Sequence, residues 1–289
     1  MRPWRRITAA DEFAAQRADA VERLRARRRR ADGFDTPLRE LPAGEIWVHD
    51  TEPELTVWLL PGHDRVNIAD ITGGVLSAQS TWSELVALAA AQGWPGQMIF
   101  STFRGDGELG ELPAVSAASR VATKMQQRAE AVAPPIVATR AMTDAEFAAY
   151  AARSVNGYAQ ELLASGAAVD ADAARAEASE SHARLLPQGL ATPGQCFWTI
   201  LDQHDRPVGL LWIHLQEHQA YIYDIEMRPE ARGRGFGTQT LRFAAAQARE
   251  AGVEVVALNV FGHNDDARRL YAREGFVETE VAWSAVTQT

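Results

Sequence analysis

The sequence predicts an α/β protein made of two similar halves. An alternating apolar run from Tyr221 to Met227 predicts a strand, and small and apolar residues from Leu241 to Ala248 recur at helical spacing. A glycine-rich turn joins this strand to the helix. An earlier stretch of the chain repeats the order strand, helix, strand, which indicates a second copy of the same unit.

The bulk composition is that of an ordinary globular protein. The chain has 289 residues, which favours two domains, and is 46% apolar and 23% charged. Its one cysteine, Cys196, excludes an intrachain disulfide and is consistent with a cytoplasmic location. The net charge of −9 argues against nucleic acid as the main partner. We expect no transmembrane helix or secretory signal, since no apolar run approaches about 18 residues.

The first half begins with a helix over residues 8–30 that ends in a run of arginines. We interpret this run as a solvated helix end rather than a partner patch, because cations are favourable at a helix C-terminus. Turn residues separate the elements that follow. These are three strands (IWVHD, LTVWLLP and RVNIADI) between residues 45 and 74, a helix at 81–92, and strands at 97–103 and 120–126.

A proline-containing segment, Ala131–Pro135, predicts a linker, because paired prolines are stiff and cannot continue a helix. The predicted domains are therefore 1–130 and 136–289, joined by 131–135. The second domain contains a strand at 136–140, helices at 143–165 and 170–186, and a hairpin of Cys196–Leu201 with Pro207–Leu215.

The two halves align on their helices. One helix ends at Gly93 and the other at Gly252, an offset of 252 − 93 = 159, and QMIFSTF then lies close to VVALNVF. On this offset the glycine-turn residues of the second half have no match in the first. Arg232, Gly235, Gly237, Asn264 and Tyr271 fall on Gly73, Leu76, Ala78, Gly105 and Leu112. The first copy is thus predicted to have kept the sheet and lost a site.

The glycine-rich turn, Arg232–Gly237, predicts an anion site. Glycines allow the backbone to approach an anion, and the first N–H groups and the dipole of the following helix face it. The turn is not a P-loop, because no GK[ST] follows the glycines. It is not a Rossmann fingerprint either, since its spacing is R-x-x-G-x-G and no acidic residue follows at the required distance.

The R-x-x-G-x-G pattern after a strand resembles the acetyl-CoA pyrophosphate loop of the GCN5-related N-acetyltransferase (GNAT) superfamily. Further on, Asn264, Ala267, Leu270, Tyr271, Gly275 and Phe276 resemble a second motif of that family, N-x-x-A-x-x-L-Y-x-x-x-G-F. The resemblance implies the acyl-CoA N-acyltransferase fold, a mixed and mostly antiparallel sheet flanked by helices. It also implies a tandem GNAT protein whose N-terminal GNAT-like domain is degenerate.

The resemblance also implies a set of residues that contact acetyl-CoA. Backbone N–H groups of the glycine turn would hold the pyrophosphate, and the strand Ile225–Met227 would pair with the pantetheine arm. The Met227 N–H would polarise the carbonyl. Asn264 either contacts the cofactor or caps a helix, and both roles can hold at once. The full set is Ile225, Glu226, Met227, Arg232, Gly233, Arg234, Gly235, Phe236, Gly237, Thr238, Asn264 and Tyr271.

Tyr271 matches the family's general acid, with a core aromatic as the alternative. The general base is harder to assign, because Asn259 stands where some members have a glutamate and an amide cannot accept a proton. Glu226 is the expected base and Asp224 the second candidate, since both lie on one face of the strand and like charges raise a pKa. A salt bridge to an arginine is the alternative role of these carboxylates. His263 is a further candidate.

These residues imply an N-acetyltransferase that moves an acetyl group from acetyl-CoA directly to a primary amine of a small molecule or a peptide N-terminus. No metal, nucleic acid or membrane is expected to take part, and either a monomer or a homodimer is compatible with the sequence. The alternatives are a non-catalytic acyl-CoA-binding sensor and a scaffold.

Overall fold

The computed structural model describes residues 4–33, 41–50, 55–72, 77–129, 135–164 and 167–287. The chain forms two compact units. Unit 1 comprises residues 1–123 and 279–289, and unit 2 comprises residues 124–278. Unit 1 is therefore discontinuous in sequence, whereas the predicted domains were continuous. Of the predicted linker only Pro135 belongs to the described residues, so a linker over 131–135 stays a prediction.

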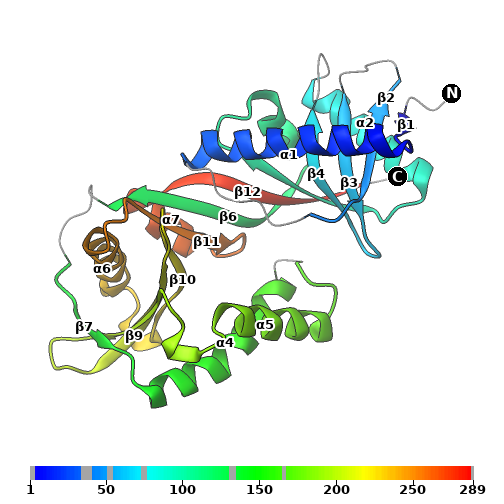
Figure 1. The fold of residues 1–289 in the computed structure, drawn as a ribbon. Coiled ribbons are helices and arrows are strands. Elements are labelled where there is room, and N and C mark those ends of the chain that lie inside the picture. The colour runs from blue at the N-terminus through cyan, green and yellow to red at the C-terminus, as the bar shows by residue number, and fades with distance from the viewer. Residues whose placement is uncertain are drawn as a thin grey trace. The chain divides into compact units, whose positions relative to one another are not determined.

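Unit 2 is built on a mixed sheet (Figure 1). The order of its strands is the second half of β6, then β11, β10, β9, β8 and β7. Strands β10 and β11 run parallel, and β10, β9, β8 and β7 are successively antiparallel. The bounds are β6 Ser119–Arg128, β7 Ala138–Ala141, β8 Gln195–Leu201, β9 Pro207–Leu215, β10 Ala220–Met227 and β11 Val255–Phe261. The predicted strands and the hairpin of the second half are confirmed.

Helices cover both faces of this sheet (Figure 1). Tyr150 of α4 packs with Leu210 and Trp212, whereas α6 packs on the opposite face against Leu211 and Ile213. Consecutive residues of β9 contact helices on opposite faces because side chains alternate between the two faces of a sheet along a strand. The helices are α4 Asp144–Ala164, α5 Ala171–Leu185, α6 Phe236–Glu250 and α7 Asp265–Arg273.

The parallel pair of β10 and β11 separates part of the way along. Pairing extends from Ala220 opposite Val256 to Ile222 opposite Leu258. A β-bulge at Tyr223 then shifts the register of β10 on β9, and β10 continues to Met227 paired with β9. The edge of β10 that faces away from β9 thus carries backbone groups beyond the bulge that are available to a ligand.

In unit 1 the strands follow the order β1-β2-β3-β4-β5-β12 and then the first half of β6. The three predicted strands, the helix and strand 97–103 are confirmed, but β1 and β12 were not predicted. The bounds are β1 Trp4–Arg6, α1 Ala10–Asp32, β2 Glu45–His49, β3 Thr56–Pro61, β4 Val66–Thr72, α2 Ala78–Gln92, β5 Gln97–Phe103, η1 Gly107–Glu111, α3 Leu112–Val115 and β12 Val277–Val286.

The parallel pair of unit 1 repeats that of unit 2. Strands β4 and β5 flank α2 as β10 and β11 flank α6, and β4 pairs with β5 only as far as Ile68 opposite Phe100. A bulge follows at Ala69, and Asp70 then lies opposite Trp58. In unit 2 the bulge is followed by Asp224 opposite Trp212. The predicted internal repeat is therefore present in the fold.

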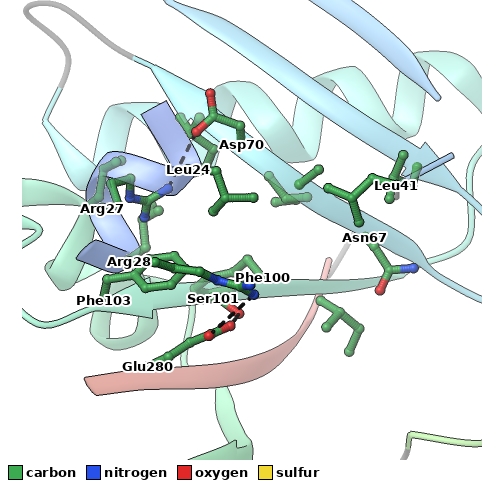
Figure 2. Close-up of a pocket in the computed structure, with 17 residues that line it drawn as sticks. Leu24, Arg27, Arg28, Leu41, Asn67, Asp70, Phe100, Ser101, Phe103 and Glu280 are labelled. Carbon is green, nitrogen blue, oxygen red and sulfur yellow. Dashed lines mark hydrogen bonds and ion pairs between the residues drawn. The ribbon is translucent and has the colours of Figure 1, made fainter. Parts of the chain in front are cut away.

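In unit 1, helix α1 lies against the place where β4 and β5 separate. Arg27 points toward Asp70, and Arg28 toward Glu280 (Figure 2). Arg23 Nε donates to Asp70 Oδ2 at 2.9 Å, and Arg27 holds Asp106 through two hydrogen bonds of 3.0 and 2.7 Å. A cavity of about 290 Å³ remains beneath the helix.

The arginine-rich end of α1 therefore differs in part from the expected solvated surface. The side chain of Arg27 is only 12% exposed and stacks over the Phe103 ring at 4.7 Å, whereas Arg29 and Arg30 are exposed. Residues 73–76, where the degenerate phosphate loop was predicted, lie outside the described residues. The loss of that loop remains a prediction.

Candidate active site

A cavity of about 790 Å³ opens in unit 2 where β10 and β11 separate. One wall is the stretch of β10 from Ile222 to Glu226, and another is β11 from Leu258 to Phe261. Helices α4 and α5 supply a third side, and Arg232, Asn264 and Tyr271 complete the lining. The structure thus brings three residues of the predicted site, Asp224, Glu226 and Tyr271, into one cavity.

The glycine turn ends at the start of α6. Gly233 and Gly235 have φ values of 70° and 85°, and a side chain at either would meet no atom within 4 Å. Glycine is required there for the left-handed backbone rather than for space. Gly235 is the N-cap and no side chain caps the helix, so the N–H groups of Phe236, Gly237 and Thr238 point out of the first turn. This geometry suits a phosphate group.

The two arginines of the turn differ in their contacts. Arg232 Nε donates to the Met227 carbonyl at 3.0 Å, so this side chain ties the turn to the end of β10. Arg234 is exposed, and its guanidinium lies 5.6 Å from the centre of the Phe236 ring. Both guanidinium groups are beside the start of α6, and their positive charge would attract the negatively charged pyrophosphate there.

The end of β10 is held close to β9. The Arg228 N–H donates to Val208 O at 2.9 Å, and N–H groups alternate along a strand, so the Met227 N–H points to the other edge, toward the separation from β11. A Cβ on Gly209 would lie 2.5 Å from both Glu226 O and Met227 Cε. Only glycine allows β9 to approach this part of β10, a requirement not recognised from the sequence.

Asp224 is a carboxyl group of the cavity wall whose pKa is shifted by its surroundings. Burial raises its pKa to about 6. Tyr150 OH donates to Asp224 Oδ2 at 3.0 Å, which opposes the rise, and the charge of Glu226 adds to it. A carboxyl group with a pKa near 6 is a base at neutral pH and can still hold a proton once it accepts one.

Glu226 is more exposed than Asp224. Its side chain is 47% exposed, and its carboxylate lies 3.9 Å from Arg153 of α4. A salt bridge to an arginine is the alternative role that the sequence left open for Glu226 and Asp224, and Glu226 makes this contact. On β11, Asn259 lines the cavity and is exposed. His263 forms an ion-pair contact of 2.8 Å with Glu161.

Tyr271 is a buried residue of α7 that also lines the cavity, so its core and catalytic interpretations are compatible. Burial raises its pKa to about 12, and the negative charge of Asp224 acts in the same direction. The hydroxyl therefore keeps its proton at neutral pH. Asn264 Oδ1 accepts from the Ala267 N–H at 3.2 Å, which confirms its role as the N-cap of α7.

Tyr150 is the site residue that sequence reasoning missed. It sits on α4, and its ring packs with Phe197 and Trp212, so it has the sequence signature of an ordinary core aromatic. Its hydroxyl is what contacts Asp224. Because the two residues are 74 positions apart in the chain, with α5, β8 and β9 between them, no local spacing could reveal the contact.

In the part of the chain that the structure describes, no cluster of three or more His, Cys, Asp or Glu side chains is arranged to bind a metal ion. Among the same residues, no helix combines the length and the apolar character needed to cross a membrane.

A mixed sheet whose parallel strands separate past a bulge, with a glycine turn at the start of the next helix, defines an acyl-CoA N-acyltransferase fold. Residues 156–276 match the model of the acetyltransferase (GNAT) family. The uncharacterized N-acetyltransferase YycN of Bacillus subtilis is 36% identical over 147 residues, which cover 50% of this chain and 94% of YycN. The chain belongs to the acetyltransferase (GNAT) family.

Two further comparisons extend this result. The uncharacterized N-acetyltransferase YdgE of Bacillus subtilis is 29% identical over 144 residues, covering 48% of this chain and 91% of YdgE. A GCN5-related N-acetyltransferase from Sphaerobacter thermophilus has a similar fold over 99% of this chain and 96% of its own, with a TM-score of 0.57 and 14% identity. Together with the repeated strand pair, this identifies two GNAT-like units in tandem.

Proposed function

We propose that unit 2 transfers an acetyl group from acetyl-CoA directly to a primary amine of a small molecule or a peptide N-terminus. The observation that carries this proposal is the pairing of two groups in one cavity. Asp224 is a carboxyl group with its pKa raised to about 6, and Tyr271 is a hydroxyl with its pKa raised to about 12. A base and an acid with separated pKa values are what acyl transfer to an amine requires.

The residues around the cavity fit acetyl-CoA, which would supply a thioester-activated acetyl group. The uncapped first turn of α6 and the positive-φ glycines would hold the pyrophosphate, with Arg232 and Arg234 beside it. The free edge of β10 from Ile225 to Met227 would hydrogen-bond the pantetheine amides, because it lacks a strand partner beyond the bulge. Asn264 lines the same cavity.

We reverse the order of the two bases predicted from the sequence: Asp224 is our general base, with Glu226 second, because Asp224 has the raised pKa and Glu226 lies near Arg153. An amine arrives as an ammonium ion and must lose a proton before its nitrogen can attack. Asp224 accepts this proton, which its raised pKa favours. Glu226 is half exposed and lies near Arg153, so its main effect is electrostatic: it raises the proton affinity of Asp224 and attracts the cation.

The remaining steps concern the acetyl carbonyl and the departing sulfur. The amine nitrogen bonds to the carbonyl carbon, and the Met227 N–H stabilises the negative charge that develops on the oxygen, a contact typically worth about 3 kcal/mol. The carbon–sulfur bond then breaks. Tyr271 donates its proton to the thiolate and recovers one from the amine nitrogen, so that amide and thiol leave neutral.

The cavity favours a cationic acceptor. Three carboxylates, Asp224, Glu226 and Glu161, line it, together with Arg153 and Arg232. Both arginines already have partners in Glu226 and in the Met227 carbonyl, which reduces their repulsion of an ammonium group. The acidic face of α5 contributes less to attracting a cation, because the side chains of Asp172 and Glu180 are 97% and 75% exposed to solvent.

The first experiment is calorimetric titration with acetyl-CoA, followed by assays of thiol release with a panel of primary amines and short peptides. One site per chain and amine-dependent thiol release are expected. Binding without release by any acceptor would favour a non-catalytic acyl-CoA sensor. Two sites would show that unit 1 also binds, and an absence of binding would favour a scaffold.

A further inference from the structure

Tyr150 lies between helix α4 and the proposed base. Its side chain is 2% exposed, and its hydroxyl donates to Asp224 Oδ2 at 3.0 Å while accepting from Ser154 Oγ at 3.3 Å. The ring is fixed by Phe197 and Trp212, at centroid distances of 5.9 and 6.3 Å. The hydroxyl therefore cannot leave Asp224 without disturbing the packing of the α4 face of the sheet.

We propose that Tyr150 is a positioning residue: it occupies one oxygen of Asp224 and leaves the other to take the proton of the acceptor amine. The proposal rests on the proposed function. A carboxylate has two oxygens and can rotate, so a fixed donor on Oδ2 selects Oδ1 as the basic atom. Tyr150 itself neither accepts nor releases a proton, because burial and the charge of Asp224 raise its pKa far above neutrality.

The hydrogen bond also sets the pH at which Asp224 becomes basic. A donor to the charged form of a carboxyl group stabilises that form, so Tyr150 lowers the pKa that burial raises. The other groups around Asp224 are Glu226 and the Ile225 N–H on β10, Arg153 on α4 and Tyr271 on α7. Of the two tyrosines near Asp224, Tyr150 is the more deeply buried, at 2% exposed against 8% for Tyr271.

The test is a carbon-13 NMR titration of the Asp224 carboxyl carbon in the full chain, with the signal assigned by its loss in Asp224→Asn. Tyr150→Phe keeps the ring and removes the donor. The apparent pKa of Asp224 should then rise by about one unit, since a hydrogen bond to a charged group is worth that much. Glu226→Gln should shift it in the opposite direction, because a negative neighbour is removed.

Tyr158→Phe is the matched control. Tyr158 also lines the cavity from α4 and packs its ring against Phe261, but it is not among the groups that shift the pKa of Asp224, so that pKa should stay unchanged. An unchanged pKa in folded Tyr150→Phe would overturn the proposal. If that variant does not fold, Ser154→Ala provides the second measurement. Loss of the Ser154 donor makes Tyr150 a weaker donor, and a fall rather than a rise in the Asp224 pKa would contradict the proposal.

A kinetic arm separates this inference from the proposed function. With the panel amine that gives the fastest thiol release, the lower limb of the pH profile of kcat/KM should move to higher pH in Tyr150→Phe, with KM for acetyl-CoA within about twofold of the parent. A pKa shift without a matching shift of the limb would show that Tyr150 tunes Asp224 but that Asp224 is not the base. No shift in either would refute the role of Tyr150.

Discussion

Asp70 and Asp224 occupy equivalent positions in the two units, each one residue after a bulge and each opposite a tryptophan on the neighbouring antiparallel strand. Their environments differ. Each lines a cavity, but Asp70 is held by Arg23 and Arg27, whereas Asp224 accepts a hydrogen bond from Tyr150. The same backbone geometry thus carries an ion-paired carboxylate in unit 1 and our proposed base in unit 2.

Replacing each aspartate with asparagine should affect different properties: stability for Asp70 and turnover for Asp224. Asp70→Asn removes a charge from a buried ion pair, so it should lower stability by on the order of 2 kcal/mol and the melting midpoint by about 4–8 °C. Turnover per folded molecule should be retained. A loss of turnover at full stability, measured by calorimetry and thiol release, would instead make Asp70 part of a working site.

Asp224→Asn should abolish most of the activity without destabilising the protein at neutral pH. The folded-state pKa of about 6 lies above the ordinary aspartate pKa of 3.8, so the folded state binds more protons than the unfolded state between these values. The parent protein should therefore lose stability as the pH rises from about 4 to 6, and the variant should lose less. Chemical denaturation at pH 4.5 and 7.5 measures the difference. A larger loss in the variant would show that the charged carboxylate is stabilising.

Tyr271→Phe should separate chemistry from binding. The phenyl ring keeps the packing of Tyr271 against Phe276, at a centroid distance of 5.8 Å, but offers no proton to the departing thiolate. We expect kcat to fall by about 100-fold, the usual range for loss of a general acid, with the Kd for acetyl-CoA nearly unchanged. Steady-state rates and calorimetry check this. An unaltered kcat would leave Tyr271 with only its structural role.

Gly209→Ala should damage the end of β10. The new methyl group would lie 2.5 Å from Glu226 O, so β9 and β10 would have to move apart beside the Met227 N–H. We expect a destabilisation of about 1–3 kcal/mol and a lower kcat, measured by thermal unfolding and thiol release. Gly110→Ala is the control, because a Cβ there meets no atom within 4 Å. Equal effects of the two changes would contradict the clash.

Local patterns were sufficient to predict the strands and helices of unit 2 and the glycine turn at the start of α6. The relation between Asp70 and Asp224 was missed because one offset was applied to the whole repeat. The aspartates differ by 224 − 70 = 154, whereas the helices starting at Ala78 and Phe236 differ by 236 − 78 = 158. The connection from the strand aspartate to the start of the helix is four residues shorter in unit 1 than in unit 2. No single offset therefore aligns both the strands and the helices of the two units. The contact of Tyr150 with Asp224 is tertiary, so it has no local signature.

The position of β12 has a consequence for biosynthesis. Its residues Val281 and Val286 pair with Thr102 and Gln97 of β5, so unit 1 includes a strand that follows the whole of unit 2 in the chain. A ribosome that has translated residues 1–123 has not yet made this neighbour of β5. The edge of β5 that pairs with β12 therefore stays unpaired during the synthesis of more than 150 further residues. Unit 2 can complete its sheet first, which reverses the usual N-terminal-first order of folding.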